Sequence, residues 1–252
     1  MSSILIQRFP DAEHVSQAAA EVFVRLAKES IAARGRFTVA LAGGSTPRRL
    51  YQLLAEALWR DQVDWPRVEF FWGDERSVPP DHADSNYRMA NEALLQKIPV
   101  QSGHVHRMQA ERMDRDRAAT EYQAEIARVF GVKLEGEPPA FDLILLGMGP
   151  DGHTASLFPH TTALKENKRW VVVNYVDKFK NERVTLTTRI LNRAANVYFL
   201  VAGADKTDRL VEVLEGPPES DRLPSQLIRP AGNLVWLVDA SAAARLSPSS
   251  LT

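Results

Sequence analysis

The sequence predicts an α/β fold in which a doubly wound, mostly parallel sheet is flanked by helices. Short apolar runs alternate along the chain with amphipathic helical segments, a pattern typical of βαβ units. Some runs, such as Leu143–Leu146, are apolar on successive residues, which indicates strands buried on both faces of a parallel sheet. No long linker and no internal repeat interrupts the 252 residues, so we expect one Rossmann-like domain over 1–252.

Each apolar run is predicted as a strand and each amphipathic segment as a helix. In chain order the strands are Ile4–Phe9, Phe37–Ala42, Val68–Gly73, Phe141–Gly147, Val171–Tyr175, Val184–Thr187, Val197–Ala202 and Leu234–Asp239. The helices are Ala12–Ala33, Pro47–Trp59, Ser85–Lys97, Arg115–Phe130 and Asp205–Leu214, with a short turn after Pro224. Gly131–Pro139 and Gly216–Pro224 are short, polar and rich in proline or glycine, which predicts loops. The chain is expected to fray from about Ser247.

Composition excludes several classes of function. The 31 Lys and Arg residues nearly balance the 32 Asp and Glu residues, so we expect neither nucleic acid nor a membrane surface as a partner, although a local basic pocket for one small anion is compatible. The absence of cysteine excludes disulfides, thiolate catalysis and cysteine metal sites. Residues 1–10 lack the pattern of a signal peptide, and no apolar run approaches the length of a membrane span. A cytoplasmic location is therefore expected.

Ligands of doubly wound sheets bind beyond the carboxyl ends of the strands, and three such junctions carry unusual chemistry. At the first, a strand runs into Ala42-Gly43-Gly44-Ser45-Thr46-Pro47. Ser45 or Thr46 can cap the next helix, with Pro47 in its first turn, and the free N–H groups there attract an anion such as phosphate. The alternative is a plain helix cap. The spacing is not that of the P-loop.

The second junction follows the strand ending at Gly73 with Asp74-Glu75-Arg76. Charges at a strand end are costly unless they pair or bind something, and Arg76 offers a fork of donors for a phosphate, a carboxylate or an oxyanion. A structural pair of Asp74 with Arg76 is the alternative. Downstream, His82 with Asp81 and Asp84 fits no strong metal template, so no metal is expected.

The third junction, residues 145–159, presents Asp151 and His153 in a glycine-rich loop after a buried strand. Gly147-x-Gly149-x-x-Gly152 formally matches the dinucleotide-binding fingerprint. Against it stand Pro150 inside the loop, His153 where the helix should begin, and Pro159, which would end any helix early. His153 is either a packed or capping residue or a general base, since an unperturbed imidazole titrates near neutral pH.

Two further groups of cations lie near predicted strands. Lys178, Lys180 and Arg183 flank the strand beginning at Val184, and Lys206 follows the strand that ends at Ala202. Each can reach a phosphate, although a surface lysine is usually only a solvated charge.

Taken together, these segments resemble the 6-phosphogluconolactonase family over about residues 37–239. The matching blocks are Ala42-Gly43-Gly44-Ser45-Thr46-Pro47, Trp72-Gly73-Asp74-Glu75-Arg76, Asp84-Ser85-Asn86-Tyr87, Leu146-Gly147-Met148-Gly149, Asp151-Gly152-His153-Thr154-Ala155-Ser156-Leu157-Phe158-Pro159 and Arg183-Val184-Thr185-Leu186-Thr187. The resemblance implies a fold of the sugar-phosphate isomerase type and hydrolysis of 6-phospho-D-glucono-1,5-lactone in the oxidative pentose phosphate pathway, without metal or cofactor. The family often has a proline-rich run after its lysine, where this chain has Phe179-Lys180-Asn181.

The same superfamily contains glucosamine-6-phosphate deaminases. The deaminases typically have Asp-Glu-Tyr where this chain has Asp74-Glu75-Arg76, and they carry a Glu where this chain has Phe158. Both differences favour the lactonase. A non-catalytic sugar-phosphate sensor on the same fold is the alternative from another class.

The resemblance gives the candidate residues their roles. His153 is the expected general base, oriented by Asp151, which alternatively binds a sugar hydroxyl. Arg76 faces either the oxyanion or the phosphate. The expected substrate and phosphate contacts are Gly43, Gly44, Ser45, Thr46, Asp74, Lys178, Arg183 and Lys206. The expected partner is the small lactone alone, bound by a monomer or weak homo-oligomer.

Overall fold

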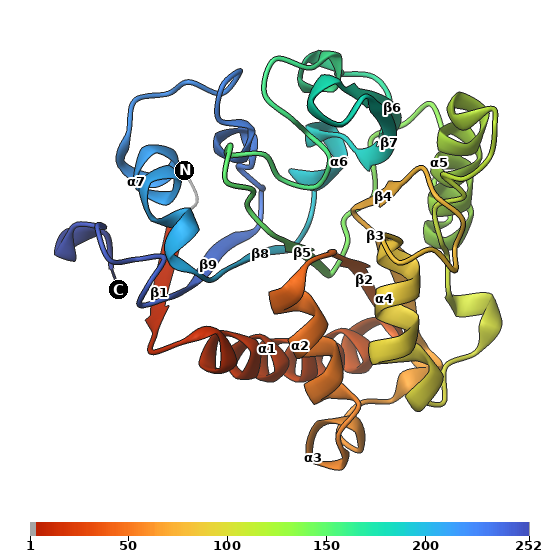
Figure 1. Ribbon diagram of the computed structural model, residues 1–252. Helices are drawn as coiled ribbons and strands as arrows, with labels where there is room; N and C mark the ends of the chain where they lie inside the picture. Colours follow the sequence, from red (N-terminus) through yellow and green to blue (C-terminus); the bar gives the residue numbers. More distant parts are fainter. Residues whose placement is uncertain (1–3, 252) are drawn as a thin grey trace.

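The computed structural model describes residues 4–251 and contains a six-stranded parallel sheet and a smaller three-stranded antiparallel sheet (Figure 1). The large sheet has the order β1-β9-β8-β5-β2-β3, and every neighbouring pair in it is parallel. Its strands are β1 (Ile4–Phe9), β2 (Phe37–Leu41), β3 (Val68–Trp72), β5 (Leu143–Leu146), β8 (Asn196–Val201) and β9 (Asn233–Asp239). The predicted fold class, a mostly parallel sheet flanked by helices, is confirmed.

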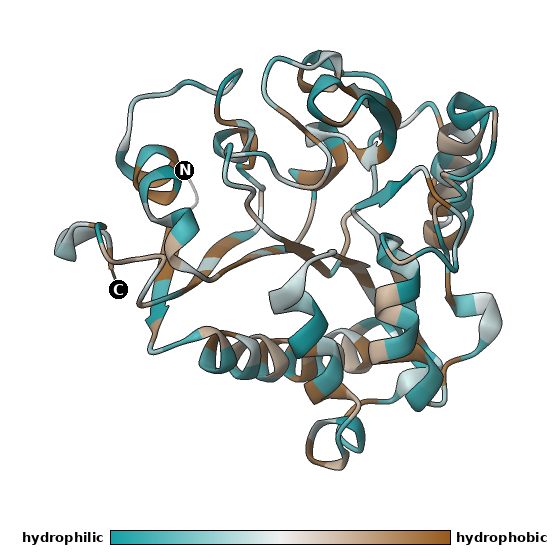
Figure 2. Cartoon of the chain, in the orientation of Figure 1, coloured by the Kyte–Doolittle hydropathy of each residue, from teal (hydrophilic) through white to brown (hydrophobic). Residues whose placement is uncertain are grey.

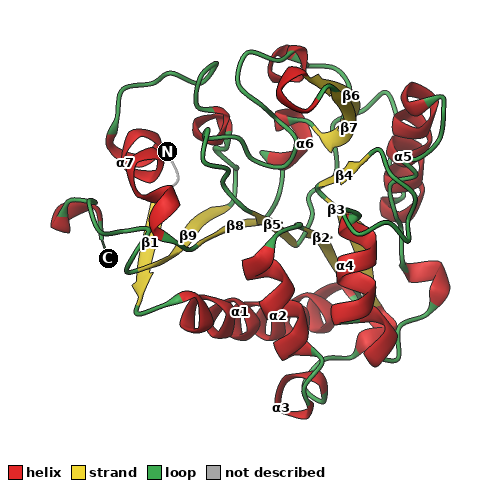
Figure 3. Cartoon of the chain, viewed as in Figure 1, coloured by secondary structure: helices red, strands yellow, loops and turns green. Residues whose placement is uncertain are grey.

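Helices cover both faces of the large sheet (Figures 1 and 3). They are α1 (Ala12–Arg34), α2 (Ser45–Leu54), α3 (Ala57–Arg60), α4 (Asn86–Ala93), α5 (Arg115–Phe130), α6 (Thr188–Leu191) and α7 (Thr207–Glu215). On one face of the sheet, α1, α2 and α4 pack against the strands and form one hydrophobic core. On the other face, α5, α7 and the small sheet form a second core. Among the helices of residues 4–251, none combines the length and the hydrophobicity of a membrane-spanning segment.

The strands of the large sheet send alternate side chains to these two cores. In β5, Leu143 and Leu145 enter the core beneath α1 and α2, whereas Ile144 and Leu146 enter the core beneath α5. All four are buried, which explains why β5 is a continuous apolar run (brown in Figure 2).

The switch in chain direction lies between β2 and β5. From β2 the chain continues outward to β3, whereas from β5 it continues in the opposite direction to β8. The connections that leave the carboxyl ends of β2 and β5 therefore diverge and leave a crevice between them, which is where doubly wound sheets bind ligands.

The small sheet has the order β4-β7-β6 and differs from the expectation of a single sheet. The predicted strands Val171–Tyr175 and Val184–Thr187 form, as β6 (Val171–Val176) and β7 (Asn181–Leu186), but they pair antiparallel with each other. The few residues between them are too short for a parallel crossover, so a hairpin is the only connection available.

Strand β4 (Asp74–Arg76) was not predicted, because three charged residues carry no strand pattern. It follows β3 after Gly73 alone. The Gly73 N–H donates to Leu41 O at 2.9 Å in β2, and Gly73 O accepts from Leu186 N at 2.8 Å in β7. Gly73 therefore joins the large sheet to the small one.

Some predicted boundaries are wrong. The predicted helix Pro47–Trp59 is interrupted at Ala55 and Glu56, where no glycine or proline marks the break, and resumes as α3. The predicted helix Ser85–Lys97 ends as α4 at Ala93 and continues as a 3₁₀ turn.

The expectation of a frayed end from about Ser247 is also wrong for residues 247–251. Ser247 N and Ser250 Oγ donate to the Glu215 carboxylate at 2.8 and 2.6 Å, and Pro248–Ser250 forms a 3₁₀ turn. Glu215 ends α7, so this anchor is distant in sequence and invisible to a local pattern.

Candidate active site

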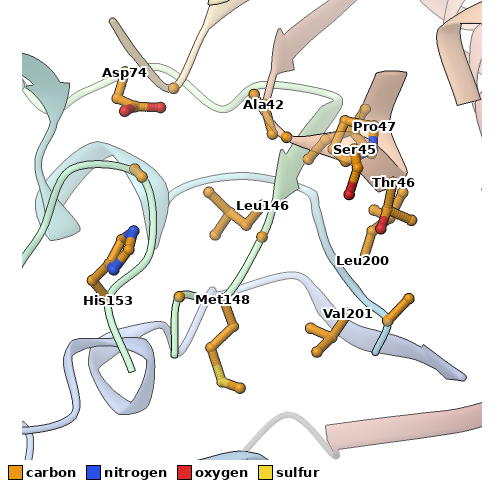
Figure 4. Close-up of a pocket in the computed structure, with 18 of the residues that line it drawn as sticks. Ala42, Ser45, Thr46, Pro47, Asp74, Leu146, Met148, His153, Leu200 and Val201 are labelled. Carbon is orange, nitrogen blue, oxygen red and sulfur yellow. The ribbon is translucent and has the colours of Figure 1, made fainter. Parts of the chain in front are cut away.

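A cavity of about 290 Å³ opens at the crevice between β2 and β5 (Figure 4). The connections after β2, β3, β5 and β8 all contribute to its walls. Eight of the predicted site residues line it, namely Gly43, Gly44, Ser45, Thr46, Asp74, Arg76, His153 and Lys206. In Figure 4, His153 and the Ser45–Thr46 turn lie on opposite sides, with Leu146 between them.

The wall after β2 is built from backbone. Gly44 is the N-cap of α2 with φ +107°, a conformation that favours glycine, and it offers no side chain to the first N–H groups of the helix. A Cβ on Gly43 would lie 2.0 Å from Asn86 Oδ1, so glycine is required there as well. The uncapped N-terminus of α2 thus faces the cavity with its dipole and donors free for an anion.

Lys206 adds a cation to the same cavity from the turn after β8. Its side chain is mostly buried, and its Nζ lies 2.9 Å from Asp205 Oδ2. The ammonium group therefore has one carboxylate partner and retains other donors for a ligand.

The opposite wall is built from side chains of the loop after β5. His153 Nδ1 lies 2.5 Å from Asp151 Oδ1, which leaves Nε2 without a partner among the residues described. Its ring stacks on Phe158 with centroids 4.0 Å apart and an interplanar angle of 23°. The imidazole is thus fixed by one carboxylate and one phenyl ring while its second nitrogen is free.

Asp151 is held in its ionised form. Burial alone would raise its pKa, but the hydrogen bond and charge of His153, together with Lys178, hold the pKa of this carboxyl well below its usual range. Lys178 Nζ lies 3.4 Å from Asp151 Oδ2. An ionised carboxylate on Nδ1 favours the tautomer that presents Nε2 as a proton acceptor.

The glycine-rich loop allows this geometry. A Cβ on Gly149 would lie 2.0 Å from His153 Nδ1, so only glycine permits the pair to sit over this turn. Thr154 Oγ1 donates to Gly147 O at 2.9 Å and closes the loop. Ala155 takes φ +48° at the cavity wall, a left-handed conformation that non-glycine residues rarely adopt.

Asp74 is fixed by two residues that sequence reasoning missed. Ser156 Oγ donates to Asp74 Oδ2 at 2.6 Å, and Asn86 Nδ2 donates to the Asp74 backbone O at 2.9 Å and to Oδ1 at 3.3 Å. Both side chains are buried. Each lies inside one of the blocks that carry the family resemblance, but only the fold brings them to Asp74.

Glu75 does not line the cavity, and its carboxylate instead holds the start of α4 in place. Its carboxylate accepts the N–H groups of Asn86 and Tyr87 at 2.8 Å each, as well as Ser85 Oγ at 3.1 Å, at the start of α4. Burial raises its pKa, against the opposing effect of these backbone donors. Glu75 thus caps α4 from the adjacent strand.

Arg76 lies directly opposite Arg183 in the β4–β7 pair. Arg76 Nη1 donates to Asp84 O at 2.7 Å, while the Nε atoms of both arginines are buried without a partner among residues 4–251. Burial and the charge of Arg76 lower the pKa of Arg183. Two adjacent guanidiniums with unused donors form a position that an anion would stabilise.

Three predicted residues lie outside the cavity wall. Asp151 stands behind His153, Arg183 stands beside Arg76, and Lys178 lies on the adjoining surface with Asp151 and Phe158. Within residues 4–251 no three histidine or carboxylate side chains are grouped as a metal site would need. His82 Nδ1 instead accepts a hydrogen bond from Asp84 N at 3.1 Å.

Comparison with known proteins places these features in a family. Residues 10–236 match the family model described as glucosamine-6-phosphate isomerases/6-phosphogluconolactonase. The 6-phosphogluconolactonase of a Synechocystis strain is 44% identical over 90% of this chain and 91% of its own length. That of a Nostoc strain is 39% identical over 96% and 98%.

Solved structures agree. The 6-phosphogluconolactonase of Trypanosoma brucei superposes with a TM-score of 0.86 and 32% identity, over 98% of this chain and 100% of that one. A monomeric glucosamine-6-phosphate deaminase, 19% identical with a TM-score of 0.78, shares the fold over 95% of this chain and 99% of that one. The chain belongs to the glucosamine-6-phosphate isomerase/6-phosphogluconolactonase family.

Proposed function

We propose that this protein hydrolyses 6-phospho-D-glucono-1,5-lactone to 6-phospho-D-gluconate, with His153 as the general base. The proposal rests on one observation above all. An Asp151–His153 pair with a free Nε2 stands on one side of a cavity whose other side is the uncapped N-terminus of α2. The relatives named 6-phosphogluconolactonase support the same reaction.

The proposed chemistry begins with a water between His153 and the lactone carbonyl. Nε2 takes a proton from the water as its oxygen attacks the carbonyl carbon, and Asp151 stabilises the imidazolium that forms. The tetrahedral intermediate then expels the ring oxygen, which takes the proton from Nε2. One water is consumed, the ring C–O bond breaks, and a carboxylic acid and a hydroxyl group result.

The phosphate is proposed to bind at the N-terminus of α2, through the backbone at Gly43 to Thr46 and with help from Lys206. We assign Arg76 to this end of the substrate. Besides the main cavity, it lines an adjoining one of about 300 Å³ together with Gly44, Ser45 and Arg48. Arg183 stands beside it in the register of the small sheet.

Asp74 is proposed to bind sugar hydroxyl groups. Its Oδ2 accepts from Ser156 and its Oδ1 from Asn86, and each oxygen has a further lone pair that can accept a hydroxyl group at the cavity wall. Phe158 occupies the position of the deaminase glutamate and stacks on His153, which leaves no carboxylate there for opening an amino-sugar ring. The cytoplasmic location, the single domain over 1–252 and the monomeric or weakly oligomeric state stay predictions from the sequence.

A lactonase assay tests the proposal. Freshly generated 6-phosphogluconolactone is added, and acid release is corrected for spontaneous hydrolysis. Turnover well above that background is expected. Binding of 6-phosphogluconate without any turnover of the lactone would instead indicate a sensor, and ammonia release from glucosamine 6-phosphate would indicate a deaminase.

A further inference from the structure

Phe179 lies at the turn between β6 and β7, directly after Lys178. It ends the 3₁₀ turn Asp177–Phe179, and 47% of its surface is exposed. Single exposed apolar residues are common, so exposure alone says little. The contacts of the ring are what distinguish it.

The Phe179 ring is connected to the proposed base, His153, through the ring of Phe158. It meets Phe158 edge-to-face, with centroids 5.7 Å apart and an interplanar angle of 82°. Phe158 in turn stacks on His153. Such aromatic pairs fix relative orientation, so the position of Phe179 is set by the same ring that supports His153.

Two cations lie over the Phe179 ring. The Arg183 Cζ atom is 5.3 Å from its centroid, and the Lys178 Nζ atom is 5.6 Å from it. Both distances fall within the range of about 6 Å for cation–π attraction.

Arg183 needs such a partner more than an ordinary surface arginine does. It faces Arg76 across the strand pair, and its Nε is buried without a hydrogen bond to any described residue. Loss of water on burial and, to a smaller extent, repulsion from Arg76 both disfavour this position of the guanidinium. The negative charges of Asp74, Glu75 and Asp84 oppose these effects in part, and the face of Phe179 adds an attractive contact directly on the guanidinium.

We propose that Phe179 is a positioning residue that holds the Arg183 guanidinium beside Arg76, where its charge reinforces that of Arg76 toward one anionic group of the substrate. This rests on the proposed function, in which that group is the phosphate. Phe179 touches no reacting atom, and His153 keeps Asp151 and Phe158 without it. Its removal should therefore weaken substrate binding and leave the chemical step almost unchanged.

The test compares Phe179→Leu, which keeps apolar bulk but removes the π face, with Phe179→Tyr, which keeps the ring. In Phe179→Leu, KM for 6-phosphogluconolactone should rise about fivefold, with kcat within about twofold of wild type. The single variant Phe179→Tyr should have the same KM as the wild type. The matched control is Tyr175→Leu, an exposed aromatic of the same hairpin over which no described cation lies.

Calorimetry with 6-phosphogluconate separates this inference from the proposed function. Failure of the wild-type protein to turn over the lactone would refute the proposed reaction, but Kd for 6-phosphogluconate should still rise about fivefold in Phe179→Leu. Unchanged KM and Kd in Phe179→Leu would overturn the role of Phe179. So would equal weakening in Phe179→Tyr, or a fall in kcat at constant KM.

Discussion

The two walls of the cavity are made in different ways. The wall after β5 depends on side chains, since Asp151, Phe158 and His153 are arranged by specific hydrogen bonds and ring contacts. The wall after β2 depends on backbone, since Gly43 and Gly44 leave a helix N-terminus open. Chemistry needs a particular proton acceptor, whereas anion binding needs donors in a particular geometry. We therefore expect substitutions at the first wall to change kcat and those at the second to change KM.

The largest expected effect is that of His153→Ala. Removal of the proposed base should lower kcat by about 10²–10⁴-fold, because general-base catalysis contributes that much, while KM changes little. The measurement is steady-state hydrolysis of the phosphorylated lactone. His160→Ala is a matched control, since His160 Nδ1 also bonds to a carboxylate, Asp221, at 2.6 Å, but lies outside the main cavity. A near-wild-type kcat in His153→Ala would remove His153 from the mechanism.

Arg76→Lys should have the next largest effect and decides which end of the substrate Arg76 serves. Lysine keeps the charge but not the fork of donors, so KM should rise about tenfold with a smaller change in kcat. Arg67→Lys, at an exposed ion pair with Asp64 away from the cavity, serves as the control. A loss confined to kcat would instead assign Arg76 to the oxyanion.

Gly44→Ala probes the backbone wall. There is room for the added methyl group, with Pro47 Cδ as its nearest neighbour at 3.8 Å, but φ +107° strains any L-residue. The turn should relax away from this geometry, so KM should rise about threefold and Tm should fall by about 2–4 °C. Gly103→Ala, whose added Cβ would meet nothing within 4 Å, should change neither quantity. An unchanged KM in Gly44→Ala would argue against phosphate at this helix end.

The smallest effect is expected in the pH dependence of stability. Because the folded pKa of Asp151 is lowered, its ionised form stabilises the folded state above the unfolded pKa of about 3.9, and this contribution is lost as pH falls through the lower folded pKa. The difference in free energy of unfolding between wild type and Asp151→Asn should therefore shrink as the pH falls from about 5 to about 3, the range in which an unfolded aspartate begins to take up its proton. Urea unfolding measures it, and a difference that grows on acidification would contradict the assignment.

Local sequence patterns predict the large sheet well, because its strands are buried on both faces and its helices are amphipathic. They also predict most of the cavity wall, since parallel strands carry their carboxyl ends to one edge. They do not predict β4, whose pairing comes from the hairpin β6–β7 and not from its own charged residues. Nor do they predict that Ser156 fixes Asp74, or that Glu75 caps α4, because each contact is made between separate segments by the completed fold.

The link at Gly73 has a consequence for how ligand preference could be changed. The guanidinium groups of Arg76 and Arg183 lie on the three-stranded ribbon, whereas His153 lies on a loop of the parallel sheet. Gly73 is hydrogen-bonded to both sheets and is the residue at which the chain passes from one to the other. Under the proposed function, substitutions in the hairpin should change which charge the ligand carries without altering the loop that holds the proposed base.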